Sequence, residues 1–265
     1  MTIDKNDFLT GLKSLLRYHR AIGIDNYQKG TESEAFLRFQ PPSSTMPRTV
    51  VQGISGRGKA DAMRSLKAPE KSSLNLAEIA EEVAACRACD LHKQRLYPVA
   101  GRGPEKVRLL LVGDWLASDE QGQLPPNQLF GVEQDLMLAR MLAAIQLPLN
   151  TVFITNVIKC AVPATCQPQA NHVQSCVSFL RRQITVLMPE IICTMGMIAA
   201  RATLEKSLPL SRLRGRLHEF EVSKDVKIPV VTTYHPTYLL QNAEMKSATW
   251  ADLQFLAREL RQKSG

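Results

Sequence analysis

The sequence predicts an α/β fold: a three-layer α/β/α sandwich with a central, mainly parallel four-stranded sheet, preceded by an N-terminal helical and flexible extension. From about residue 107 onward, short aliphatic runs alternate with longer amphipathic segments. The short runs are apolar at nearly every position, which is typical of parallel strands buried on both faces. Strands that alternate with helices in this way favour a sheet with helices packed on both sides.

Four strand–helix pairs make up this alternation. The predicted strands are residues 107–114, 151–159, 190–196 and 228–235, and the predicted helices are residues 129–147, 171–187, 197–206 and 247–262. Ligands of such sheets bind beyond the carboxyl ends of the strands. The residues at those ends are Gly113–Asp114, Thr155–Asn156, Gly196 and His235–Pro236.

The first 75 residues differ in character from the rest. Residues 5–21 are predicted to form a short amphipathic helix, and residues 25–75 are rich in Gly, Ser, Pro and charge without a sustained period. We therefore predict two parts: residues 1–75, a helix with a flexible basic linker, and residues 76–265, the folded domain. The linker is either a solvated tether or an arm that contacts nucleic acid. The folded part opens with LAEIAEEVAACRAC, predicted as a helix that runs into two cysteines.

Composition narrows the class of protein. The chain has 265 residues, of which 45% are hydrophobic, enough for a sizeable core. It has no apolar run of membrane-spanning length and no signal-peptide pattern, so we expect a cytoplasmic protein with reduced cysteines and no membrane partner. The formal net charge of +8 favours polyanionic partners, above all nucleic acid.

Six cysteines fall into separate clusters. Cys86 and Cys89 form a CxxC pair, and Cys160 and Cys176 flank the loop that follows the second predicted strand. If that loop folds back, four thiolates suit either a [4Fe–4S] cluster or a structural zinc. Cys193 lies within an apolar strand and is expected to be a core residue. Cys166 stands in the same loop and remains ambiguous.

The motifs and their order resemble the iron–sulfur (family 4) uracil-DNA glycosylases. The resemblance spans residues 83–260 and rests on CRAC, VRLLLVGD, LFGVEQDLMLARML, TNVIKC with a cysteine 16 residues later, RGRLH and YHPTYLL. It implies a DNA substrate and a [4Fe–4S] cluster. The four cluster ligands would be Cys86, Cys89, Cys160 and Cys176.

The same resemblance implies roles for four residues at the strand ends. Asn156 matches the residue that reads the base, and Phe130 the aromatic that stacks on it. His235 matches the histidine that stabilises the departing base, and Asp114 stands where the family has a glutamate. Each has a structural alternative: a turn former for Asn156, a core residue for Phe130, a structural histidine for His235 and a helix cap for Asp114.

The first motif departs from the family pattern. The family reads roughly GEAPG, whereas this chain has GDWLA, followed by a longer loop. This loop forms one wall of the base pocket, and the shorter acid and the bulky Trp115 would either reshape the pocket for another base, slow the enzyme or close the pocket. Asp119 and Glu120 offer further carboxylates. In RGRLH, Arg214 and Arg216 are candidates for phosphate contacts or for a structural role.

Two functions follow as hypotheses. The first is a monomeric DNA glycosylase that flips uracil or another aberrant base out of single- or double-stranded DNA and hydrolyses its N-glycosidic bond. The second is a catalytically weak iron–sulfur protein of the same fold that binds DNA or recruits a partner. A zinc-stabilised nucleotide-binding domain is a more remote third.

Overall fold

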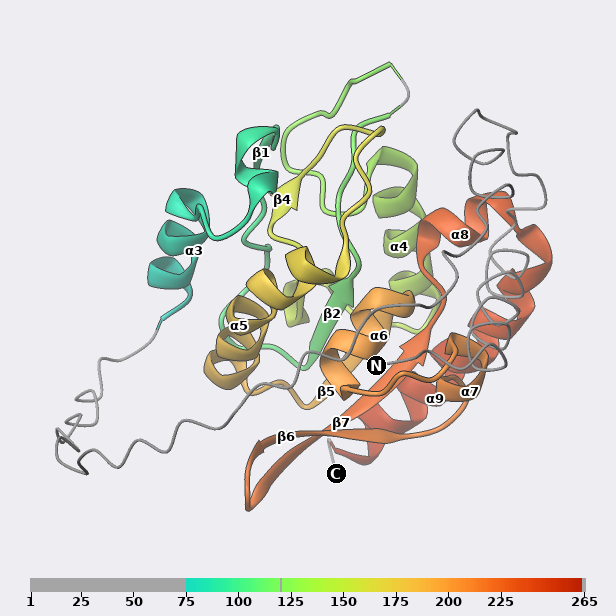
Figure 1. The fold of residues 1–265 in the computed structure, drawn as a ribbon. Coiled ribbons are helices and arrows are strands. Elements are labelled where there is room, and N and C mark those ends of the chain that lie inside the picture. Colours follow the sequence, from blue (N-terminus) through green and yellow to red (C-terminus); the bar gives the residue numbers. More distant parts are fainter. Residues whose placement is uncertain (1–74, 120, 264–265) are drawn as a thin grey trace, which may run out of the picture. The chain divides into compact units, whose positions relative to one another are not determined.

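The computed structural model describes residues 75–119 and 121–263. Its centre is a sheet of five strands in the order β3-β2-β5-β7-β6, with helices on both faces (Figure 1). Two short strands of two residues each, β1 and β4, pair with each other outside the main sheet. The strands of the main sheet are β2 (Leu109–Gly113), β3 (Val152–Asn156), β5 (Ile191–Met195), β6 (His218–Ser223) and β7 (Val226–Thr233).

The four predicted strands are present and parallel. The register pairs Gly113 of β2 with Asn156 of β3, and Thr194 of β5 with both Val112 and Thr232. The carboxyl ends of these strands therefore meet at one edge of the sheet, as predicted.

The predicted number of strands was wrong, because a fifth strand, β6, pairs antiparallel with β7. Its sequence, HEFEVS, buries His218 and Phe220 and exposes Glu219 and Glu221. Such alternation is typical of an edge strand with one wet face. The prediction relied on continuous apolar runs, and these mark only strands buried on both sides.

The two faces of β2 belong to two separate parts of the core. Leu109 and Leu111 pack with residues of α4 (Val132–Ala144) and α9 (Lys246–Gln262). Leu110 and Val112 point the other way and pack with residues of α5 (Ala170–Leu187) and α6 (Met197–Leu204). This arrangement confirms the three-layer sandwich.

The CxxC segment is held against this sandwich by α3 (Leu76–Ala85). Ile79 and Val83 of α3 pack on Phe179 of α5, and Figure 1 shows the two helices side by side. The helix ends at Ala85, with Cys86 as its C-cap residue, so it runs directly into the CxxC pair, as predicted. A 3₁₀ turn, η1 (Asp90–Lys93), follows Cys89.

The strand that leads toward Cys160 is shorter than predicted: residues 151–159 were expected to be one strand. β3 ends at Asn156, and Cys160 lies in β4 (Cys160–Ala161), which pairs antiparallel with β1 (Tyr97–Pro98). The chain thus leaves the main sheet before it reaches Cys160. β1 brings the segment after the CxxC pair alongside it.

The remaining elements complete the carboxyl-terminal half. They are η2 (Leu149–Thr151), α7 (Leu210–Leu213), α8 (Pro236–Gln241) and η3 (Ala243–Met245). The predicted helix at residues 5–21 and the predicted linker up to residue 74 lie outside the described residues. Within the described part, no helix is long and apolar enough to cross a membrane.

Candidate active site

The strand ends bring three of the candidate residues into one group. Gly113 ends β2 directly beside Asn156, which ends β3. The rings of Phe130 and His235 lie 4.8 Å apart between centroids and are tilted by 55°. All three candidates, Asn156, Phe130 and His235, are buried.

Gly113 makes this group possible. A Cβ atom at Gly113 would lie 2.2 Å from Cε1 of Phe130 and 2.4 Å from Oδ1 of Asn156. Both distances are far below a van der Waals contact, so only glycine allows the aromatic ring and the amide to approach the strand together. Gly113 therefore shapes the site although it carries no side chain.

Asn156 has one polar atom in use and one without a partner. Its Nδ2 donates a hydrogen bond to the carbonyl oxygen of Leu129 at 2.6 Å. Its Oδ1 is buried and has no hydrogen-bond partner among the described residues. A buried amide oxygen without a partner costs free energy, and a donor group on a ligand would remove that cost.

Phe130 is held in place by a residue that the sequence did not single out. The carboxylate of Asp135, in the first turn of α4, accepts hydrogen bonds from the backbone N–H groups of Leu129 and Phe130, both at 3.0 Å. The N-cap residue Gly131 makes no side-chain cap. Asp135 thus closes the helix start from within and orients the ring.

His235 is the N-cap of α8, and its ring is in a defined tautomer. Nδ1 accepts a hydrogen bond from the backbone N–H of Thr237 at 3.2 Å. Burial lowers the pKa of His235 to about 4, so the ring is neutral near pH 7. Because Nδ1 accepts, the proton of the neutral ring is on Nε2. That atom is buried and has no partner among the described residues.

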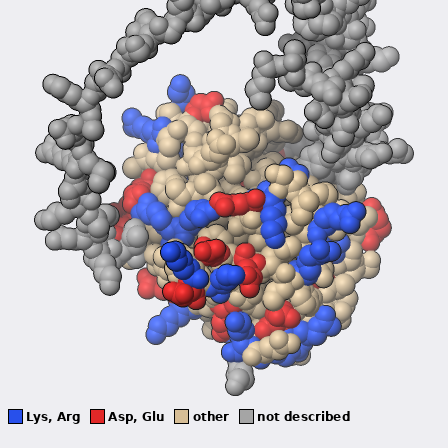
Figure 2. Space-filling view, turned by 60° about the horizontal axis from the view of Figure 1, so that its bottom comes forward, with Lys and Arg blue, Asp and Glu red and all other residues tan. Residues whose placement is uncertain are grey.

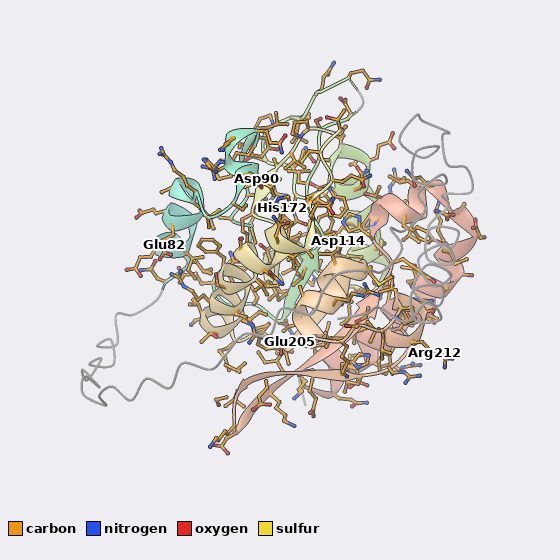
Figure 3. The ribbon with its side chains drawn as sticks, viewed as in Figure 1. Glu82, Asp90, Asp114, His172, Glu205 and Arg212 are labelled. Carbon is orange, nitrogen blue, oxygen red and sulfur yellow. The ribbon has the colours of Figure 1, made fainter. Side chains whose placement is uncertain are left out.

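Asp114 points to the start of α6. Its Oδ1 accepts a hydrogen bond from the backbone N–H of Ala199 at 2.6 Å. Figure 3 shows Asp114 beside the start of α6. Burial raises the pKa of the Asp114 carboxyl to about 7, and hydrogen bonds from the backbone of Ala199 and Ile198 oppose the rise. The N-cap residue of α6, Gly196, has no side chain, so Asp114 supplies the cap from another strand.

Trp115 and Asp119 lie in the loop that follows Asp114. Trp115 packs with the cluster that contains Cys160 and Cys176. The carboxylate of Asp119 accepts a hydrogen bond from the backbone N–H of Gln123 and closes an exposed turn. Asp119 is therefore engaged in the loop itself, and Glu120 lies outside the described residues.

Four cysteines from three segments lie within electrostatic reach of one another. Burial raises the pKa of Cys160, and the thiols of Cys89 and Cys86 raise it further. Burial also raises the pKa of Cys176 to about 11, again with contributions from Cys160 and Cys89. Cys193, by contrast, lies in β5 within the core of the sandwich.

The sulfurs are not arranged for one ion. Among residues 75–119 and 121–263, no three His, Cys, Asp or Glu side chains are placed to hold a single metal ion. Four thiolates around one zinc would each be about 2.3 Å from it and hence about 4 Å from one another. In a four-iron cluster each thiolate binds a different iron.

Two polar contacts that the sequence analysis missed tie the cysteine segments together. His172, near the start of α5, makes a contact of 2.7 Å through Nε2 with Oδ1 of Asp90, which directly follows Cys89 (Figure 3). Lys159 is buried next to Cys160 and donates to Oγ1 of Thr155 at 2.7 Å and to Oε1 of Gln183 at 2.6 Å. The lysine next to the apolar residues of NVIKC was the sequence signal from which a buried Lys159 could have been predicted.

The two candidate arginines differ in environment. Arg214 donates from Nε to the carboxylate of the buried Asp252 at 2.7 Å, and its guanidinium lies 4.3 Å above the ring of Tyr234. Arg216 is exposed, and the described residues give it no hydrogen bond or ion pair. The geometry thus separates a side chain engaged in the fold from one open to solvent.

Comparisons with known proteins show which family the chain resembles. Residues 100–254 match the model of the uracil DNA glycosylase superfamily. The chain is 32% identical to the type-4 uracil-DNA glycosylase of Archaeoglobus fulgidus, over 68% of this chain and 90% of that protein. It is 30% identical to the type-4 uracil-DNA glycosylase of Sulfurisphaera tokodaii, over 70% and 84% respectively. The matching enzyme of Thermotoga maritima is 29% identical, over 62% and 82%.

Proposed function

The chain belongs to the type-4 uracil-DNA glycosylases of the uracil DNA glycosylase superfamily, and from this premise we propose that it excises uracil from DNA. The reaction breaks the bond between C1′ of the sugar and N1 of the base. The electron pair leaves with the base, and water supplies the oxygen that C1′ gains. The site must therefore recognise a base edge, stabilise an anion and tolerate positive charge on the sugar.

One observation carries the proposal. Four buried side-chain polar atoms of the described residues have no hydrogen-bond partner, and two of them are Asn156 Oδ1 and His235 Nε2. One is an acceptor and the other a donor, and both belong to residues that contact the Phe130 site. Unpaired buried polar atoms are rare in folded proteins, so a ligand with one donor and one acceptor is the natural partner.

Uracil has the edge that Asn156 can read. Its N3–H is a donor that Oδ1 can accept, and its O4 can accept the hydrogen of Nδ2 that Leu129 leaves free. Cytosine presents an acceptor at N3 and a donor at C4, so the same amide orientation would leave two buried polar groups unpaired. Such mismatches give strong discrimination, while the ring of Phe130 provides the stacking surface.

His235 suits the departing anion. Its neutral Nε2–H can donate to the base oxygen on which negative charge grows. A neutral donor in a buried site needs no reorganisation as the charge develops, and one such donor contributes about 10²–10³ in rate. The tautomer required is the one that the N–H of Thr237 imposes.

Asp114 is the candidate carboxylate that would stabilise the positive charge on the sugar or activate the attacking water. Its carboxylate ionises near pH 7, so both protonation states are present at neutral pH. The same carboxylate caps α6. We propose that it serves both purposes, with the capping bond from Ala199 fixing the orientation of the group.

The cofactor that best fits the thiols is a [4Fe–4S] cluster bound by Cys86, Cys89, Cys160 and Cys176. The support is the proximity of these thiols, since Cys86 and Cys89 act electrostatically on Cys160, and Cys89 and Cys160 act on Cys176. The cluster would join the CxxC segment to β4 and α5. We assign it a structural role, since the base-reading group lies at the ends of the main sheet.

DNA is the proposed partner, and its phosphates would meet basic side chains. Figure 2 shows Lys and Arg interspersed with Asp and Glu over the face on view, so the positive charge is not gathered there. Of the 33 lysines and arginines in the chain, 12 precede Leu76. We propose that this segment and Arg216 contribute phosphate contacts, which would make binding fall steeply with salt.

The test is a strand-cleavage assay after alkali on oligonucleotides that each carry one modified base, in single- and double-stranded form. Release of uracil but not of cytosine is the expected result. The rival function is a DNA-binding protein with little activity. It is favoured by the bond from Asn156 to Leu129, which occupies part of the reading amide. DNA binding without release of any base would overturn the enzymatic proposal.

A further inference from the structure

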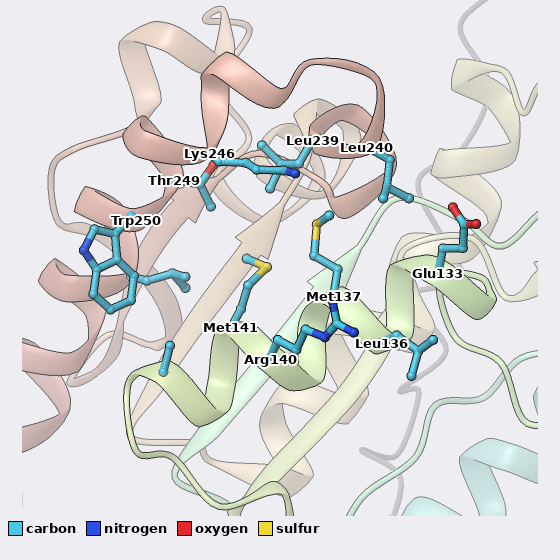
Figure 4. Close-up of a pocket in the computed structure, with 12 residues that line it drawn as sticks. Glu133, Leu136, Met137, Arg140, Met141, Leu239, Leu240, Lys246, Thr249 and Trp250 are labelled. Atoms are coloured by element: carbon cyan, nitrogen blue, oxygen red, sulfur yellow. The ribbon is translucent and has the colours of Figure 1, made fainter.

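A groove of about 500 Å³ lies between α4 and the segment formed by α8, η3 and α9 (Figure 4). Its floor is apolar. Met137 and Met141, one turn apart on α4, point toward the wall formed by α8 and α9, where Leu239 and Leu253 line the groove. The volume is that of a ligand or peptide-binding site.

The rim of the groove leaves large apolar side chains in water. Leu136 is 58% exposed, Trp250 is 41% exposed and Leu240 is 38% exposed. Together with the two methionines they line the same groove. Large exposed apolar patches mark interaction sites, and methionines allow such a surface to adapt to its ligand.

A buried hydroxyl in the groove has no partner. Thr249, in the first turn of α9, lines the groove, is 2% exposed, and its Oγ1 makes no hydrogen bond within the described part of the chain. The hydroxyl is withdrawn from bulk water, so leaving it unpaired is unfavourable. It therefore points independently to an occupant that carries a polar group.

The charges of the walls indicate the nature of that occupant. Arg140 of α4 and Lys246 of α9 are exposed, stand on opposite walls and make no ion pair with any described residue. Glu133 stands near the start of α4, away from Trp250 in Figure 4. The groove is thus apolar in its floor, cationic on both walls and anionic near one end.

We propose that this groove docks a peptide segment of another protein in which aliphatic side chains are flanked by carboxylates. The aliphatic side chains would fill the space above Met137 and Met141. The carboxylates would pair with Arg140 and Lys246, and a peptide group would bond to Thr249. Rim pairs of this kind select the partner and its orientation.

A nucleic acid strand fits the same groove poorly. Strands bind to rows of aromatic platforms and to a track of cations. The lining here is mostly aliphatic, with Trp250 as the one aromatic side chain among its described residues, so it offers a single stacking platform where a strand needs a row. The inference goes beyond base excision and stands independently of it. An occupant would nevertheless lie close to the catalytic group, because Phe130 precedes α4 and His235 begins α8.

The experiment uses the full chain with its cofactor, labelled with ¹³C at the methionine methyl groups. The signals of Met137 and Met141 are assigned with Met137→Leu and Met141→Leu. Three synthetic peptides serve as probes. They share a central run of leucine and isoleucine and are flanked by aspartates, serines or lysines. The aspartate peptide is expected to shift both signals and to bind about tenfold or more tightly than the lysine peptide, the scale of two charge-assisted contacts.

Variants separate the parts of the proposal. The double variant Arg140→Gln/Lys246→Gln should abolish the preference for aspartate, whereas Arg261→Gln, at the far end of α9, should retain it. Thr249→Val should weaken binding about threefold to tenfold, the value of one hydrogen bond, without lowering the thermal midpoint of the free protein. The proposal fails if no peptide shifts the two signals or if the preference survives the double variant. It also fails if a single-stranded oligonucleotide shifts them in place of the peptides.

Discussion

The carboxylate of Asp114 lies directly against the backbone of Gly196. A Cβ atom at Gly196 would approach Oδ2 of Asp114 to 2.4 Å, and the backbone of Gly196 has a φ of +108°. Two separate requirements therefore demand glycine at this position. The contact lets a carboxylate from β2 reach the first N–H groups of α6, so the site residue and the helix start depend on each other.

Asp114→Asn distinguishes a catalytic carboxylate from a helix cap. An asparagine can still accept the hydrogen bond from Ala199 but cannot ionise. If the carboxylate acts in the reaction, single-turnover base release by the wild type should rise with pH through about 7, the pKa of Asp114, and the variant should lose this rise. A variant with wild-type rate and pH profile would leave Asp114 with the capping role alone.

The same variant has a predicted effect on stability. A carboxyl whose pKa is raised by folding binds its proton more tightly in the folded state. The free energy of unfolding therefore falls as pH rises from the unfolded pKa, near 3.8, to about 7. Asp114→Asn should remove this fall. Thermal midpoints at pH 5 and pH 8 measure it, and the difference between the two should be smaller for the variant.

Gly113→Ala should disable the site without unfolding the sheet edge. The added methyl group must displace the ring of Phe130 and Oδ1 of Asn156, so base release should fall by about 10² or more, as for loss of a preorganised group. Gly122→Ala is a control for a methyl group added away from the site: a Cβ there meets nothing within 4 Å, and the φ of +76° confines the strain of an alanine to that exposed turn, so base release should be retained. Wild-type activity in Gly113→Ala would show that this group does not receive the base.

Asn156→Ala and His235→Ala should each lower single-turnover release of uracil by about 10² or more, since each removes one preorganised hydrogen-bonding group. Iron content should stay unchanged. Because burial holds the pKa of His235 at about 4, its donor stays neutral through pH 5. In Asp114→Asn, where the ionisation of Asp114 is removed, the rate should accordingly show no ionisation near pH 6.5, the ordinary pKa of histidine. A wild-type rate retained in both variants would place the chemistry elsewhere.

Substitution of Arg214 should affect the stability of the fold, whereas substitution of Arg216 should affect DNA binding. Arg214→Gln breaks the pair with the buried Asp252 and should lower the thermal midpoint, because a buried carboxylate loses its partner. Arg216→Gln should leave the midpoint unchanged and weaken binding of all DNA sequences alike. Calorimetry and fluorescence anisotropy at two salt concentrations measure these effects. The reverse result would exchange the two roles.

If the four cysteines bind one cluster, the purified protein should be brown and contain about four irons per chain, as four-thiolate ligation implies. Replacing Cys86, Cys89, Cys160 or Cys176 with alanine should each remove the iron, while Cys193→Ala in the core should retain it. Iron analysis and absorbance near 400 nm provide the measurement. Stoichiometric zinc in a colourless protein would contradict the assignment.

Local sequence determined the framework of the fold. Strands buried on both faces must be apolar at every position, so four of the five strands could be located before their neighbours were known. Their carboxyl ends then had to share an edge, which brought Asn156 and His235 to one side of the sheet. β6 was not predicted, because a half-exposed edge strand has no continuous apolar run.

Tertiary structure alone decided which groups the candidate residues engage. Asp114 meets Ala199, Asp90 meets His172, and Arg214 meets Asp252, each across more than 35 residues of chain. Such pairs depend on strand register and helix packing, and neither leaves a local pattern. The unpaired atoms of Asn156, His235 and Thr249 belong to the same class, because whether a polar atom lacks a partner is known only once everything around it is in place.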